Sequence, residues 1–203
     1  MNPGIDTKFV EEHYQRMSDE DLIRIATQEA YGLTPEAFEI MKSEIKKRGL
    51  NENLLESVKA QNKTYSPEEI EVYCNLVREL SCPVCGNSEH LLNATITGEV
   101  VSYIFFTSSK KQIKVGCPDC LDKLNDKALT KTALLGWWGI PWGIIKTIQY
   151  IVINIDNKRL NHSDEHNESL RSFALDCIGE LEMYKDDKEK LQQIVRMQNM
   201  YTP

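Results

Sequence analysis

The chain has 203 residues, 41% of them hydrophobic, and a formal net charge of −7. This length allows one medium-sized domain or two small ones, and the acidic charge disfavours nucleic acid, whose phosphates bind mainly Lys and Arg. The charge is uneven. Residues 1–80 hold 16 acidic and 10 basic residues and residues 161–203 hold 9 and 5, whereas residues 81–160 hold 6 and 9. The middle of the chain is therefore mildly basic.

Residues 1–64 predict an N-terminal unit of short helices. Ser18 is a favourable N-cap residue, and the three acids that follow it suit the positive end of a helix dipole. A second helix is predicted to begin at Thr34-Pro35 and to end at Gly49. The segments 17–23, 33–37 and 44–50 resemble a small helical unit found in many uncharacterised bacterial proteins, and this resemblance implies no chemistry.

Two Cys-Pro-x-Cys motifs, here called the knuckles, carry the clearest chemical signal in the chain. The first contains Cys82 and Cys85, and the second contains Cys117 and Cys120. Each motif points two sulfur atoms toward one point, and two such pairs complete the tetrahedral thiolate shell that Zn²⁺ prefers. We expect one structural Zn²⁺ per chain. Two disulfides, unliganded thiols and a redox pair are the alternatives.

The residues between the knuckles predict a three-stranded antiparallel sheet with zinc at one end. Alternating and β-branched residues favour strands at 92–97, 100–107 and 112–115, with turns at 98–99 and 108–111. The capping box that begins at Ser66 predicts a helix that leads into the first knuckle. The predicted fold class is therefore α+β, mostly helical, with a central zinc ribbon.

A tryptophan-rich apolar segment follows the second knuckle. A helix is predicted over 121–135 and another over 144–155, and the turn at 136–143 contains all three tryptophans of the chain. Three glycines and Pro141 interrupt the apolar run, so a spanning helix, which needs about 20 continuous apolar residues, is disfavoured. The segment could be a core hairpin or an interfacial hairpin, because tryptophan suits both a buried core and a membrane interface.

The order of these motifs resembles a family of uncharacterised bacterial zinc-ribbon proteins. The resemblance covers residues 82 to about 155 and rests on the two knuckles, the lysine-bearing helix and the run Gly-Trp-Trp-Gly-Ile-Pro-Trp-Gly at 136–143. It implies a zinc ribbon and a bound metal, and the chain is similar to proteins in which the tryptophan segment is treated as membrane-proximal. The resemblance implies no known activity.

The rest of the chain predicts C-terminal helices and gives a three-part organisation of 1–64, 65–160 and 161–203. His162 and His166 have the i, i+4 spacing of a shared metal site on a helix, although the stretch is polar and lacks further ligands. Cys74 and Cys177 fit helical patterns as small buried residues. The first six residues lack the basic and apolar regions of a secretory signal, and metal thiolates fit a reducing compartment. We therefore expect a position in the cytoplasm or at the cytoplasmic face of the membrane.

No nucleotide-binding loop, nucleophile elbow or zinc-hydrolase motif is present in the sequence, so we expect a non-catalytic protein. The leading hypothesis is that the zinc ribbon supports an apolar surface that binds a protein partner or a membrane. The residues expected to form this surface are Trp137, Trp138, Ile140 and Trp142. An alternative is nucleic-acid binding through Lys110, Lys111, Lys114, Lys123 and Lys127. A third hypothesis is an acidic immunity-type protein that neutralises a basic partner.

Overall fold

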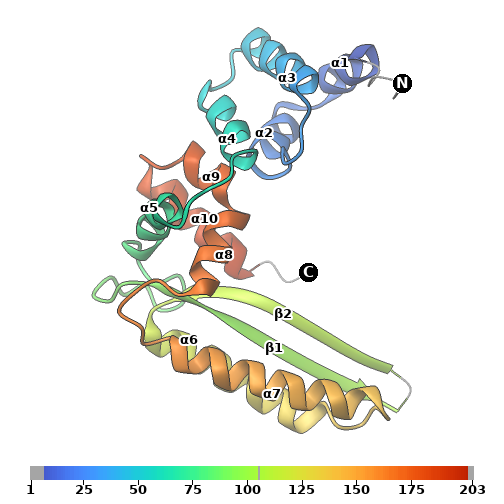
Figure 1. Ribbon diagram of the computed structural model, residues 1–203, viewed down its shortest axis with the longest axis vertical. Coiled ribbons are helices and arrows are strands. Elements are labelled where there is room, and N and C mark those ends of the chain that lie inside the picture. Colours follow the sequence, from blue (N-terminus) through green and yellow to red (C-terminus); the bar gives the residue numbers. More distant parts are fainter. Residues whose placement is uncertain (1–6, 105, 201–203) are drawn as a thin grey trace. The chain divides into compact units, whose positions relative to one another are not determined.

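The computed structural model describes residues 7–104 and 106–200, and it confirms a mostly helical α+β fold (Figure 1). Residues 1–6, on which the expectation of no secretory signal rests, lie outside the described part. The chain forms two compact units. Unit 1 consists of Met1–Ser66 and Cys177–Asp187, and unit 2 consists of Pro67–Asp176 and Lys188–Pro203.

Unit 1 consists of short helices whose ends follow from the sequence. The helices are α1 (Thr7–Arg16), α2 (Asp19–Gln28), α3 (Pro35–Arg48), α4 (Asn53–Gln61) and α9 (Ile178–Met183). The side chains of Ser18 and Thr34 accept hydrogen bonds from backbone N–H groups at the starts of α2 and α3, as their N-cap positions predict. A core of apolar residues that includes Leu22, Met41 and Ile45 lies between these helices.

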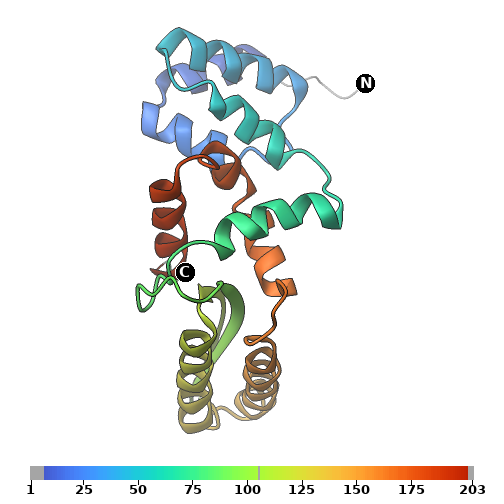
Figure 2. The ribbon, with the colours of Figure 1, turned by 90° about the vertical axis from the view of Figure 1, so that its left-hand side faces the viewer.

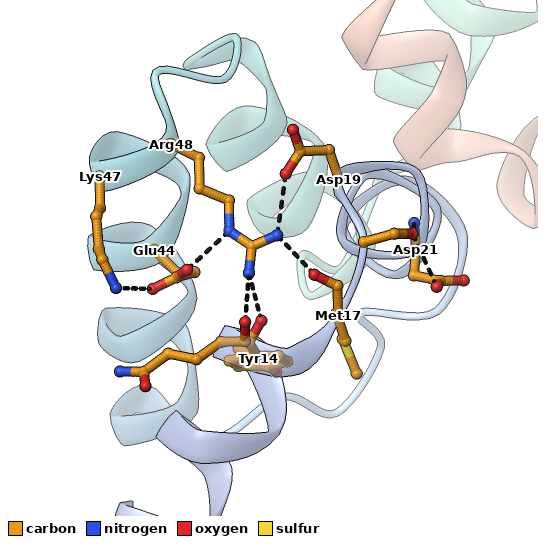
Figure 3. Close-up of polar contacts among 9 residues, drawn as sticks. Tyr14, Met17, Asp19, Asp21, Glu44, Lys47 and Arg48 are labelled. Carbon is orange, nitrogen blue, oxygen red and sulfur yellow. Dashed lines mark hydrogen bonds and ion pairs between the residues drawn. The ribbon is translucent and has the colours of Figure 1, made fainter.

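Arg48 joins the first three helices of unit 1 (Figure 3). Its guanidinium group donates to Glu44 at 2.7 Å, to Asp19 at 2.9 Å, and to the backbone oxygens of residues 14, 15 and 17. These oxygens lie at the end of α1, where carbonyl groups have no partner within the helix. Arg48, a residue of α3, therefore supplies hydrogen-bond donors to the carbonyl groups at the end of α1.

Unit 2 is organised around one long β-hairpin. The strands β1 (Asn93–Tyr103) and β2 (Phe106–Gly116) pair in antiparallel register from Asn93 with Gly116 to Tyr103 with Phe106. The unit also contains the helices α5 (Pro67–Arg78), α6 (Pro118–Leu135), α7 (Trp142–Leu160), α8 (Glu168–Asp176) and α10 (Lys188–Met200). The described residues thus form a two-stranded sheet, and the prediction of three strands was wrong.

Two helices, and not the predicted third strand, pack against the free edge of β1. Helices α6 and α7 run along both sides of this edge (Figures 1 and 2), and their side chains hydrogen-bond to its backbone. Asn154 of α7 accepts from the N–H of Gly98 at 3.1 Å and donates to its carbonyl at 2.7 Å. Thr132 of α6 accepts from the N–H of Val100 at 3.1 Å and donates to the carbonyl of Gly98. The helices therefore satisfy the backbone groups that another strand would use.

Gly98 marks the close approach of α7 to the strand rather than the turn that was predicted there. A Cβ atom at this position would lie 2.6 Å from Cδ1 of Tyr150, which is far too close for a packed carbon pair. Glycine in a strand interior often marks such an approach of another element. The predicted turn at 108–111 is also absent, because these residues continue β2 opposite 98–101.

Candidate metal centre and apolar end

The structure brings the four predicted ligand cysteines together. Cys82 and Cys85 belong to the loop between α5 and β1, whereas Cys117 and Cys120 lie at the start of α6. Their four Sγ atoms lie within 4.8 Å of one another. This is the one group of three or more metal-ligating side chains found in residues 7–104 and 106–200.

The local backbone explains why each knuckle turns its two sulfur atoms inward. In the first knuckle, the N–H of Gly86 donates to the carbonyl of Cys82 at 2.8 Å, and Gly86 has a φ of 78°, which glycine adopts without strain. In the second knuckle, Cys117 is the N-cap of α6 and Pro118 follows at the first helical position. The N–H of Cys117 also donates to Sγ of Cys82 at 3.3 Å, so the second knuckle holds a sulfur atom of the first.

The spacing of the sulfur atoms fits a tetrahedral metal ion. Zn–S bonds of about 2.3 Å place the corners of a tetrahedron about 3.8 Å apart. Sγ of Cys85 lies 3.8 Å from Sγ of Cys117. This is also far beyond the roughly 2.05 Å of a disulfide bond, and all six cysteines are unbridged. The side chains present therefore fit Zn²⁺.

The electrostatics of the cluster call for a cation. Burial raises the pKa of Cys82, but the N–H groups of Cys117, Cys85 and Val84 outweigh it and lower this pKa to about 7. Burial and neighbouring thiols raise the pKa of Cys120 well above its usual range. Like charges this close disfavour each other, so four thiolates together require a positive ion between them.

The remaining cysteines are buried as predicted. Cys74 of α5 has no exposed surface, and burial raises the pKa of its thiol to about 11. Cys177 of unit 1 is 3% exposed. A thiol with a raised pKa is a poor nucleophile, because the thiolate is the reactive form. Cys74 therefore behaves as a small apolar residue of the core.

At the other end of the hairpin lies a surface that we call the apolar end, which consists of residues 100–104, 106–109 and 132–145. All three tryptophans are on it and are exposed, by 42% for Trp137 and 66% for each of Trp138 and Trp142. Ile140 is 82% exposed. If each tryptophan ring offers about 200 Å², the three rings alone expose about 350 Å². This area alone is within the range of about 300–600 Å² that the largest apolar patch on a typical monomer covers, and such a patch is often a binding site.

Sequence reasoning missed the contribution of the β-hairpin to this surface. Tyr103, Ile104 and Phe106 at the end of the hairpin are exposed beside the turn between α6 and α7. A shallow cleft of about 600 Å³ is lined by these three residues together with Leu135, Trp138 and two further β1 residues. One sequence signal was available, since residues 100–109 and 132–145 both lack any charge.

The helix α7 is built with its polar side inward. Its fully buried residues are Gly143, Thr147 and Asn154, whereas Ile148 and Val152 are about half exposed. An ordinary surface helix has the opposite arrangement. The exposed apolar residues of α7 therefore contribute little to packing within the unit, and they continue the apolar end along the helix.

The five candidate lysines do not form one continuous surface. Lys110 and Lys111 are consecutive on β2 and so point to opposite faces of the strand. Lys111 lies over the ring of Tyr150, with 5.6 Å from its nitrogen to the ring centroid. Lys114 donates to the carbonyl of Asn199. Lys114 and Lys127 line a common cleft of about 280 Å³, and Lys123 lies one helical turn before Lys127.

The two histidines have separate partners. They lie in the turn between α7 and α8, so the helical spacing that suggested a shared metal does not apply. His162 is 3.2 Å from a carboxylate oxygen of Asp122, and His166 is 4.0 Å from one of Glu71. Each ring is thus placed against a different acidic side chain.

None of the helices within residues 7–104 and 106–200 combines the length and the apolar character that a membrane span requires. Comparison with protein-family models, with curated proteins and with solved structures found no match to this chain.

Proposed function

We propose that this protein is a non-catalytic binding protein in which one structural Zn²⁺ holds the base of unit 2 and the apolar end is the docking surface. The ligands of the zinc are Cys82, Cys85, Cys117 and Cys120. Four thiolates fill the coordination shell and leave no position for a substrate. The zinc fixes the start of β1 against the start of α6, and these elements extend to the apolar end.

One observation carries this proposal: in the apolar end, unit 2 exposes large apolar side chains, while polar side chains are buried beside them. Among the described residues, 11 of the 23 exposed large hydrophobic side chains belong to the apolar end, while Thr132, Thr147 and Asn154 are buried beside them. Exposing this much apolar surface to water is unfavourable unless a partner covers it. A binding surface explains the arrangement, whereas a purely structural hairpin would bury these side chains.

Nucleic-acid binding is the weaker hypothesis. Lys111 and Lys114 each have a partner within unit 2, and the lysines on β2 point to both faces. An immunity-type role for the acidic helices has only their charge in its favour.

Tryptophan fluorescence tests the proposal directly, because all three tryptophans lie in the apolar end. In the zinc-loaded monomer, we expect the rings to be accessible to the quencher acrylamide, and metal analysis should give about one zinc per chain. Rings that are shielded in a chain shown to be monomeric by sedimentation would refute the docking surface. A zinc content near zero in protein purified without chelators would refute the metal centre.

A further inference from the structure

The apolar end has a boundary of lysines. Residues 100–109 and 132–145 carry no Asp, Glu, Lys, Arg or His, and the residues at their limits are Glu99, Lys110, Lys131 and Lys146. Glu99 is the one acid among these four, and Lys131 lies 2.5 Å from it. Lys110, Lys131 and Lys146 together with Lys111 form what we call the basic collar. The apolar end is therefore uncharged, and the basic collar that borders it has a net positive charge.

The collar lies at a defined distance from the end of the hairpin. Lys110 pairs with Glu99, and this pair lies four residues along the strands from the pair Tyr103 and Phe106. At about 3.4 Å per residue, this distance is about 14 Å. Lys146 is at nearly the same level, since its nitrogen donates to the hydroxyl of Ser109 at 2.8 Å. One leaflet of a bilayer offers about 15 Å of hydrocarbon.

We infer that the apolar end binds the surface of an anionic lipid bilayer, with its tryptophans among the acyl chains and the basic collar at the headgroups; this inference rests on the proposed function. An amphipathic segment lying in the interface inserts by about 5–10 Å. Insertion by about 10 Å leaves the collar, about 14 Å from the end of the hairpin, about 4 Å from the boundary of the acyl chains, which is within the Debye length of about 8 Å. The charge pattern fits a plane of one sign, because the lysines on β2, α6 and α7 all border the same uncharged surface.

The strand edge that leads into the apolar end has backbone groups that hydrogen-bond within the protein, which suits an environment without water. Unpaired N–H and C=O groups are costly in lipid. The free edge of β1 leads into the apolar end, and Thr132 and Asn154 satisfy its backbone at Gly98 and Val100. The indole N–H of Trp137 likewise donates to the carbonyl of Ala133 at 2.7 Å. Thr132 and Asn154 face inward, whereas Trp137 and the other large apolar side chains of the apolar end are exposed.

The test uses the zinc-loaded full chain with vesicles of phosphatidylcholine alone and of phosphatidylcholine mixed with phosphatidylglycerol. We expect a blue shift of tryptophan emission with the anionic vesicles and quenching by lipids brominated on their acyl chains. Each lysine near an anionic surface contributes about 5-fold in affinity, so Lys110→Gln with Lys146→Gln should weaken binding about 25-fold. Lys123→Gln with Lys127→Gln is the matched control. It removes the same charge further from the apolar end, and its effect should be about 2-fold or less because of screening.

Three results would overturn the membrane inference. The first is the absence of a blue shift with anionic vesicles while acrylamide still reaches the rings, which leaves the docking surface intact and directs it to a protein. The second is a stable dimer whose tryptophans are shielded by a second copy of the chain. The third is equal loss of binding in both lysine pairs, which would indicate a general charge effect. Shielded rings in a monomer would instead refute the proposed function itself.

Discussion

Helix α3 of unit 1 and helix α7 of unit 2 place their apolar residues in opposite ways. Helix α3 of unit 1 buries Met41 and Ile45 completely, whereas α7 of unit 2 buries Thr147 and Asn154 and leaves Ile148 exposed. Unit 1 is thus stabilised mainly by hydrophobic burial. The hairpin of unit 2 also buries apolar residues, such as Val100 and Val115, but polar side chains of α6 and α7 cover the free edge of β1, and the cysteine cluster lies at its other end. This difference leaves the apolar side chains of unit 2 available for binding.

Removing the metal should have the largest effect, and it should affect unit 2 alone. Structural zinc contributes on the order of 10 kcal/mol to the folding of small zinc domains. We expect Cys85→Ala to abolish zinc binding and to unfold the knuckles and the strand ends between them. Tryptophan fluorescence during urea titration reports on unit 2, because unit 1 contains no tryptophan.

Cys74→Ala is the matched control for this experiment, since Cys74 is also a cysteine of unit 2 but lies outside the cluster. It should retain about one zinc per chain and lose only the stability expected for a small cavity, about 1 kcal/mol. Normal zinc content in Cys85→Ala would show that Cys85 is not a required ligand, and loss of zinc with an unchanged urea midpoint would show that the metal does not stabilise the unit.

The second largest effect should come from making the interior of unit 2 apolar. Asn154→Leu removes both hydrogen bonds to Gly98 and leaves its buried N–H without a partner, whereas the carbonyl keeps the hydrogen bond from Thr132. One buried backbone group without a partner costs about 1–3 kcal/mol, so we expect a loss of about 2 kcal/mol in the free energy of unfolding measured by urea titration. Gln149→Leu on the exposed side of the same helix should change it by less than about 0.5 kcal/mol. A gain in stability for Asn154→Leu would mean that the polar interior is not required.

The helices of both units could be predicted from the sequence because their signals are local. Ser18, Thr34 and the glycine after α3 act within a few residues, and the structure places helix boundaries close to them. The third strand was predicted because β-branched runs and turn residues are also local signals. What decided against it is a contact between residues far apart in sequence. The edge of β1 accepts Asn154 and Thr132 as partners, and Gly98 permits the approach of Tyr150.

The candidate site was predictable to a similar extent. Two motifs of two cysteines each specify their own spacing, so the cluster of Cys82, Cys85, Cys117 and Cys120 follows from the sequence. The tryptophans were also identified, but their exposure could not be, because an apolar helix can be buried or exposed with the same sequence. Polar residues at Thr147 and Asn154 were the available indication that the apolar side of α7 faces outward.

A smaller, pH-dependent effect should appear in unit 1. Burial raises the pKa of Glu44, but the hydrogen bond from Arg48 and the charge of Lys47 outweigh it and hold this pKa below its usual value. A carboxyl group with a lowered pKa in the folded state stabilises the fold above its unfolded pKa, near about 4.3. This stability is lost as the pH falls through the lower, folded value. Far-UV circular dichroism of thermal unfolding should show it, and Glu44→Gln should reduce the pH dependence in this range. An unchanged profile in Glu44→Gln would exclude the contribution of this pair.

The smallest effect should come from the most exposed apolar residue. Ile140 is 82% exposed in the apolar end, so Ile140→Ser removes almost no buried contact and should change the free energy of unfolding by less than about 0.5 kcal/mol. The same substitution at Ile45, which is completely buried in unit 1, should cost about 3 kcal/mol or more, since it leaves a cavity and buries a hydroxyl group. Urea titration measures both changes. If Ile140→Ser costs as much as Ile45→Ser, the residue is buried in solution and the two units do not differ in the way described. If Ile140→Ser is neutral for folding yet weakens binding to anionic vesicles, the apolar end contributes to binding and not to stability.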